Sequence, residues 1–101
     1  MKSFGDMVKQ AQKMKRTMDD LQKRFAEDRY EASAGGGLVR VVVDGKQILK
    51  QISLDPALLS EKDVTLIEDL VMTAIGEAQK NSEARMHEAL GTLAGGFPIP
   101  F

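Results

Sequence analysis

The 101-residue chain contains no cysteine and no tryptophan, and its apolar residues never form a long uninterrupted run. Without cysteine there is no disulfide framework, no thiolate site for zinc or an iron–sulfur cluster, and no thiol nucleophile. A bilayer-spanning helix would need about 18 consecutive apolar residues. The first residues, Met1 to Asp6, lead into a charged segment rather than into the apolar core of a signal peptide. We therefore expect a soluble protein of the cell interior that does not insert into a membrane.

Groups that commonly carry catalysis are also scarce. The one histidine, His87, stands near Glu83 and Glu88, and a catalytic histidine needs partners held in a defined geometry. The paired carboxylates, such as Asp19-Asp20, are sequence neighbours, and neighbours on a helix point about 100° apart instead of converging. We expect no enzyme activity, no metal site, no cofactor and no small-molecule substrate.

Charge is distributed unevenly along the chain. The formal net charge is −1, yet residues 1–25 carry seven basic and three acidic side chains, whereas residues 54–101 carry three basic and eight acidic ones. A molecule with this asymmetry can present a basic arm to a polyanion although its overall charge is slightly negative.

The N-terminal segment has the pattern of a long helix, from about residue 3 to residue 28. Its apolar residues recur every 3.5 positions, which is typical of a helix that packs along another helix. This apolar seam consists of Phe4, Met7, Ala11, Met14, Met18, Leu21 and Phe25. Core packing is the favoured interpretation, and an adaptable Met-rich surface for another protein is the alternative.

In residues 29–54 the sequence pattern changes from the repeat of a helix to that of β-strands. Alternation from Tyr30 to Ala34, a β-branched run from Leu38 to Val43, and Lys46 to Leu54 indicate three antiparallel strands joined as a meander. Asp44-Gly45 suits a type I′ turn, in which both central residues have positive φ.

Residues 55–94 read as helices. Asp55-Pro56 predicts a single helical turn, and Ser60 with Asp63 resembles a capping box that begins a longer helix ending before Gly95-Gly96. Gly76 weakens this helix, and the nearly all-polar stretch 79–85 predicts that the helix leaves the core there. Residues 95–101 are expected to form an extended tail. The fold class is therefore α+β, with a long helix at each end of a small sheet.

The predicted lengths of the helices point to assembly. The two long helices would measure roughly 39 and 50 Å, whereas six-residue strands span only about 20 Å. Such a sheet cannot cover both helices, so the surplus apolar seam needs a partner. The simplest partner is a second copy related by a two-fold axis, and we expect a homodimer.

Basic residues line the first helix opposite its apolar seam. Lys2, Lys9, Arg16 and Lys23 recur every seven residues, and Lys13 widens the row. A basic ridge about 31 Å long can contact several phosphates of a duplex and release counterions. The candidate DNA-binding residues are Lys9, Lys13, Arg16 and Lys23. An ordinary solvated outer face is the competing interpretation of this row.

Several local strings resemble the YbaB/EbfC family of bacterial nucleoid-associated proteins. They are Gly35 to Val41, Gly45 after a strand, Ile52 to Leu59, Ile67 to Val71, Ala74 and Ala78, and the Gly/Pro-containing tail that includes Pro100-Phe101. The resemblance covers nearly the whole chain. It implies one DNA-binding domain over residues 1–101, with a helical arm (1–28), strands (29–54), helices (55–94) and a tail (95–101).

The resemblance also implies a function. Proteins of this family are expected to form tweezer-shaped homodimers that bind double-stranded DNA with modest sequence preference, in the bacterial cytoplasm at the nucleoid. The alternative is a coiled-coil-like adaptor or chaperone-like protein that binds another protein through the Met-rich seam.

Overall fold

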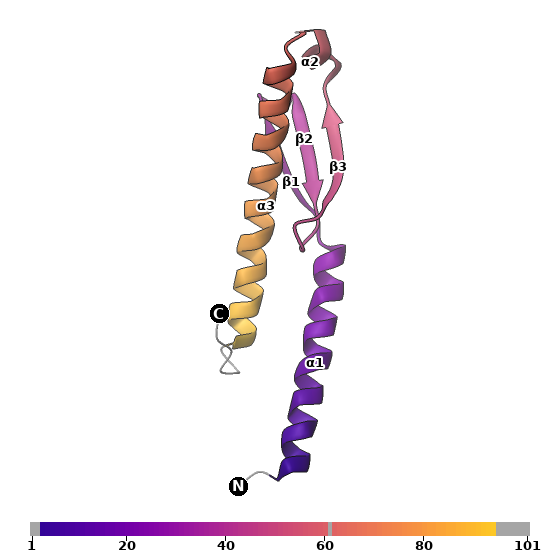
Figure 1. Ribbon diagram of the computed structural model, residues 1–101, viewed down its shortest axis with the longest axis vertical. Helices are drawn as coiled ribbons and strands as arrows, with labels where there is room; N and C mark the ends of the chain where they lie inside the picture. The colour runs from indigo at the N-terminus through magenta and orange to yellow at the C-terminus, as the bar shows by residue number, and fades with distance from the viewer. Residues whose placement is uncertain (1–2, 61, 95–101) are drawn as a thin grey trace.

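The computed structural model describes residues 3–60 and 62–94 and confirms the predicted α+β fold. A long helix at each end of the chain flanks a three-stranded antiparallel sheet with the strand order β1-β2-β3 (Figure 1). The predicted helix end at Gly95-Gly96 and the predicted tail over 95–101 lie outside the described residues. The elements are α1 (Phe4–Glu27), β1 (Tyr30–Ala34), β2 (Val39–Val43), β3 (Leu49–Leu54), α2 (Pro56–Ser60) and α3 (Val64–Ala94).

Helix α1 begins and ends at locally encoded caps. At its start, the Asp6 N–H donates a hydrogen bond to the Ser3 hydroxyl oxygen at 3.2 Å. At its end, Asp28 has extended backbone, and its N–H donates to the main-chain oxygens of Arg24 and Phe25. These contacts satisfy main-chain groups that a helix terminus otherwise leaves unpaired.

The sheet has one apolar and one polar face, as strand alternation requires. Val39, Val41 and Val43 of β2 are fully buried beneath α3. On the opposite face Arg40 approaches Glu31 to 3.9 Å, and both side chains are exposed. Helix α3 packs on β1 and β2 but leaves β3 uncovered (Figure 1), and every residue of β3 is exposed.

The β2–β3 connection differs from the predicted type I′ turn. Among the described residues around it, positive φ occurs at Gln47 (65°) and not at Asp44 or Gly45. The Gln47 N–H donates to the Asp44 oxygen at 3.1 Å, and the Asp44 N–H donates to the Ile48 oxygen at 2.9 Å. This is a three-residue loop that ends in a left-handed residue, so β3 begins at Leu49 rather than at Lys46.

Gly45 has a different role from the one that the turn type predicted. Its N–H donates to the Phe25 oxygen at 2.7 Å, which joins the hairpin to the last turn of α1. A β-carbon at this position would lie 2.6 Å from the same oxygen. Glycine is therefore required here by close approach of two main chains.

The capping box predicted at Ser60 is also wrong. The Ser60 hydroxyl donates back to the Ala57 oxygen at 2.7 Å, inside α2. Asp63 caps α3 instead, because its carboxylate accepts the Leu66 N–H at 3.0 Å. The long helix accordingly starts at Val64, while Asp55 caps the predicted short helix by accepting the Ala57 N–H at 2.9 Å.

Helix α3 does not leave the core along its polar stretch, contrary to the prediction for residues 79–85. Ser82 is fully buried, and its hydroxyl donates to the Asp44 oxygen at 2.7 Å. Gln79 Nε2 donates to the Gln47 oxygen at 3.2 Å. The helix packs there on the β2–β3 loop, whose main-chain oxygens need polar partners.

The chain is elongated, as its helix lengths predicted. It measures 70 × 19 × 16 Å with a radius of gyration of 19.5 Å, whereas a compact chain of this size has about 13 Å. The core lies between α3 and the sheet and consists of Ala34, Val39, Val41, Val43, Leu58, Ala74 and Ala78. Within α1 only Phe25 is buried. Helix α1 therefore projects beyond the core as an arm (Figure 1).

Candidate nucleic-acid interface

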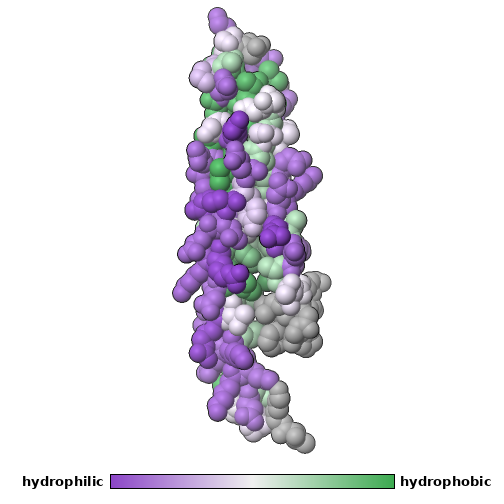
Figure 2. All heavy atoms as spheres, turned by 180° about the vertical axis from the view of Figure 1, so that it is seen from behind, coloured by the Kyte–Doolittle hydropathy of each residue, from purple (hydrophilic) through white to green (hydrophobic). Residues whose placement is uncertain are grey.

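The four basic residues singled out in the sequence share one face of α1. Lys9, Lys13, Arg16 and Lys23 are all exposed. At about 100° per residue they fall within an arc of roughly 80°, and from Lys9 to Lys23 the helix rises about 21 Å. Viewed from behind, one side of the lower half of the molecule, where α1 lies, is mainly hydrophilic (Figure 2). We call these four residues the basic face; Lys2 lies outside the described residues.

Nearby carboxylates reduce the positive charge along part of the basic face. Asp20 is exposed and lies on the same side of the helix, between Arg16 and Lys23. The segment from Lys9 to Arg16 contains no acidic residue. Ion pairs within residues 3–60 and 62–94 involve no side chain of α1. The densest group of basic residues without an intervening carboxylate is therefore the one around Lys13, in the middle of the arm.

Basic residues of the sheet are engaged in part by nearby carboxylates. Arg40 lies 3.9 Å from Glu31, and Lys50 Nζ lies 3.8 Å from the buried carboxylate of Asp44. Lys46 is exposed at the β2–β3 loop. The sheet thus offers fewer unpaired cations than α1, which is why the basic face is the better candidate.

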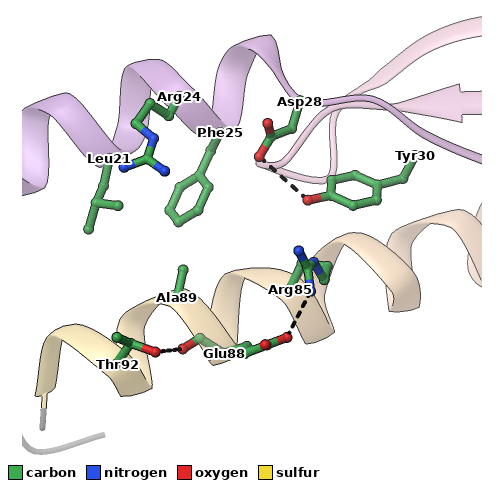
Figure 3. A pocket seen from close by; sticks show the side chains of 9 residues that line it. All are labelled: Leu21, Arg24, Phe25, Asp28, Tyr30, Arg85, Glu88, Ala89 and Thr92. Atoms are coloured by element: carbon green, nitrogen blue, oxygen red, sulfur yellow. Dashed lines mark hydrogen bonds and ion pairs between the residues drawn. The ribbon is translucent and has the colours of Figure 1, made fainter.

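A groove separates the last turns of α1 from the last turns of α3 (Figure 3). It encloses about 210 Å³, with Leu21 and Phe25 directed from α1 toward Ala89 on α3. Its charged side chains are balanced in sign, since Arg24 and Arg85 stand with Asp28 and Glu88. Balanced charge does not favour an anionic ligand in this groove.

Two polar contacts occur among the side chains that line the groove, one within each wall. Arg85 Nη1 lies 3.1 Å from Glu88 Oε2, and the Tyr30 hydroxyl donates to Asp28 Oδ2 at 3.4 Å (Figure 3). Sequence reasoning did not single out Arg24 or Arg85. The position of Arg24 beside the apolar residue Phe25 was the available signal that it borders the seam.

Other classes of site find no support in the described residues. Within 3–60 and 62–94, no group of three or more histidine or acidic side chains is arranged to hold a metal ion. His87 Nε2 lies 3.5 Å from Glu83 Oε1 on an exposed face of α3. In the same part of the chain, no helix combines the length and the apolar character that crossing a bilayer requires.

Comparison with known proteins agrees with the fold and with the resemblance seen in the sequence. Residues 1–97 match the model of the YbaB/EbfC DNA-binding family. A nucleoid-associated protein of Alkaliphilus metalliredigens is 37% identical, over 97% of this chain and 86% of that protein. A nucleoid-associated protein of Rickettsia bellii is 36% identical over the full length of both.

A solved structure shows the same fold. The crystal structure of an uncharacterized protein from Helicobacter pylori superposes with a TM-score of 0.80 at 23% identity. The superposition covers 92% of this chain and 99% of that one. The match to the family model and the whole-length similarity to the two relatives establish that the chain belongs to the YbaB/EbfC DNA-binding family.

Proposed function

We propose that this chain acts as a single domain that binds double-stranded DNA as a homodimer, through phosphate contacts from the basic face. Its role would be nucleoid organisation or gene regulation, at the nucleoid in the bacterial cytoplasm. The observation that carries the proposal is one exposed face of a projecting helix bearing Lys9, Lys13, Arg16 and Lys23. Membership of a DNA-binding family supports DNA as the polyanion. The names of the bacterial relatives support the location.

The chemistry of the basic face favours recognition of phosphates over recognition of bases. Lysine and arginine side chains neutralise phosphates, release condensed counterions and make binding strongly dependent on salt. Contacts of this kind set the position of a protein on the duplex but do not read its sequence. The basic face carries no aromatic side chain that could stack on a base. Affinity is thus expected to vary little among unrelated duplexes.

The exposed apolar side chains of β3 are the reason for proposing a homodimer. Ile52 is 44% exposed and Leu54 is 39% exposed. Both side chains lie on the face of the sheet that α3 covers over β1 and β2, because Ile52 lies opposite Val41 and Leu54 opposite Val39. With Leu49, which lies opposite the buried Val43, they form what we call the β3 apolar face. A second copy related by a two-fold axis would cover both β3 apolar faces at once, since such an interface is self-complementary. The α1 arms of both copies would stay accessible to DNA.

A salt series tests the proposal. The full chain is titrated against several unrelated duplexes of equal length, with competitor DNA, from low to moderate salt. We expect similar affinities on all duplexes and a steep, common decrease with salt, because phosphates are the same in every sequence. Binding to a single duplex with little salt dependence would contradict phosphate contacts as the source of affinity.

A further inference from the structure

The first two turns of α1 carry an exposed apolar face at the far end of the arm (Figure 1). Phe4 is 81%, Met7 is 59% and Val8 is 38% exposed, and Ala11 on the same face is exposed as well. At about 100° per residue these four residues fall within an arc of roughly 100°. We call them the apolar tip. Apolar side chains gathered on one exposed face mark a surface that contacts another molecule.

The apolar tip and the basic face lie on nearly opposite sides of α1. At about 100° per residue, the centres of the two faces are roughly 145° apart around the helix axis. An arm whose basic face lies against the phosphates of a duplex therefore directs its apolar tip away from that duplex. The occupant of the apolar tip is accordingly a protein surface, and not the DNA that the same arm binds.

The residues that border the apolar tip favour a second copy of the same helix as the occupant. Where two helices pack along a 3.5-residue repeat, the side chains beside the apolar seam select the partner. In the first two turns of α1 these positions hold Ser3, Val8 and Gln10, none of which is charged. Two copies of this lysine-rich helix can therefore meet here without placing like charges against each other, which would oppose their association.

We propose that the apolar tips of two α1 helices pack against each other, and that this contact bridges two DNA duplexes. The two helices belong to different homodimers, one on each duplex. Because the basic face of each helix then points outward, the pair presents one basic face to a duplex on either side. Packed helices lie about 8–10 Å apart, so the bridged duplexes are held side by side. The inference rests on the proposed function, because it requires the basic face to bind phosphates.

The small size of the apolar tip determines when the contact forms. From Phe4 to Ala11 the helix rises about 11 Å, whereas a stable association of proteins buries about 800 Å² on each partner. Two helical turns are too short to supply this area, so the tips do not hold homodimers together in free solution. Homodimers bound to two duplexes bring several arms together at once, and linked contacts reinforce one another. Bridging is therefore expected only on DNA.

A bridging assay tests the proposal. A duplex fixed to beads and a fluorescent duplex are mixed with the full chain, and the fluorescence retained on the beads is measured. The variant Phe4→Gln with Met7→Gln removes the largest side chains of the apolar tip and keeps a good helix former at both positions. The control, Leu59→Gln with Val64→Gln, removes side chains that are 62% and 66% exposed at the other end of the molecule (Figure 1). Affinity for a single duplex and its salt dependence are measured for every variant.

We expect the Phe4/Met7 variant to retain at least fivefold less fluorescent duplex than the parent, with parent-like affinity and salt dependence on a single duplex. The control variant should bridge as the parent does. Parent-like bridging by the Phe4/Met7 variant, or an equal loss in both variants, would overturn the proposal. A parent that binds a single duplex but bridges none would also overturn it. A parent that binds no duplex would instead contradict the proposed function itself.

Disulfide trapping supplies a second readout, since the chain has no cysteine of its own. Met7→Cys places a thiol in the middle of the apolar tip, and Gln12→Cys places one at an exposed position outside it. With oxidised glutathione as the oxidant, Met7→Cys should form disulfide-linked chains several-fold faster when DNA is added, whereas Gln12→Cys should not. No acceleration by DNA, or the same acceleration at both positions, would overturn the proposal.

Discussion

The Ser82 hydroxyl donates a 2.7 Å hydrogen bond to the main-chain oxygen of Asp44, and both residues are almost completely buried. This contact joins the middle of α3 to the β2–β3 loop. The Asp44 carboxylate in turn accepts the N–H groups of Lys46 and Ile48 at 2.8 and 3.0 Å. A polar pair thus completes the packing of α3 at the end of the sheet nearest α1.

Ser82→Ala should destabilise the fold. The substitution removes a buried donor, and a hydrogen bond of this kind contributes about 1 kcal/mol net. The neighbouring exposed residue provides a control, since Asn81→Ala should leave stability unchanged or raise it slightly through helix propensity. Denaturant unfolding of both variants measures the difference. Equal midpoints for Ser82→Ala and the parent would show that the contact adds nothing.

Gly45→Ala should destabilise the fold by more than Ser82→Ala does. The added methyl carbon would lie 2.6 Å from the Phe25 oxygen, so the end of α1 and the loop must move apart. Overpacking of a close contact typically costs about 1–3 kcal/mol. Thermal unfolding is the measurement. A melting temperature equal to that of the parent would mean that α1 does not lie against this loop.

Gly76→Ala should act in the opposite direction. Gly76 lies inside α3, and a β-carbon there would meet no neighbouring atom within 4 Å. Replacing an interior helical glycine by alanine stabilises a helix by up to about 1 kcal/mol. A rise in the unfolding midpoint is expected. A decrease would indicate that another chain packs closely on this part of α3.

The contrast between these positions shows what the sequence could reveal. The limits of α1 and the strand order follow from local signals, such as the 3.5-residue apolar repeat of α1 and the alternation from Tyr30 to Ala34, and the limits of α1 were predicted to within one residue. The role of Gly45 was not predictable, because it depends on Phe25, which is distant in sequence. The burial of Ser82 depends on Asp44 in the same way, so a polar stretch was mistaken for a solvated one.

The candidate site was likewise predictable only in part. The spacing of Lys9, Arg16 and Lys23 is local, so their common helix face could be predicted from the sequence. That α1 extends past the core was also expected, from the length of the helix relative to the strands, and the structure confirms it. The uncovered state of β3 depends on where α3 crosses the sheet, so the sequence could not show that Ile52 and Leu54 are exposed.

Ile52→Lys should separate the proposed homodimer. The substitution places a charge at the centre of the β3 apolar face, where burial against a second copy would be costly. Gln51→Lys is the matched control, because it adds the same charge on the same strand but on the opposite face of the sheet. Sedimentation at micromolar concentration should give about twice 11.1 kDa for the parent and the control, and 11.1 kDa for Ile52→Lys. A parent that sediments as a monomer would contradict the proposed assembly.

The central claim is that the basic face of α1 supplies the phosphate contacts, and the salt dependence of one double variant tests it most directly. Lys13→Gln with Arg16→Gln removes two positive charges per chain from the uninterrupted part of this face and leaves the apolar seam intact. Lys62→Gln with Lys80→Gln is the control, because it removes the same charge from exposed positions outside α1.

The measured quantity is the slope of log affinity against log salt concentration on one duplex. Two or three contacts per arm of a dimer give a parent slope of roughly −4 to −5, at about −0.9 per phosphate. The account predicts weaker binding and a shallower slope for the Lys13/Arg16 variant, with the control close to the parent. Parent-like affinity and slope in the Lys13/Arg16 variant would contradict it.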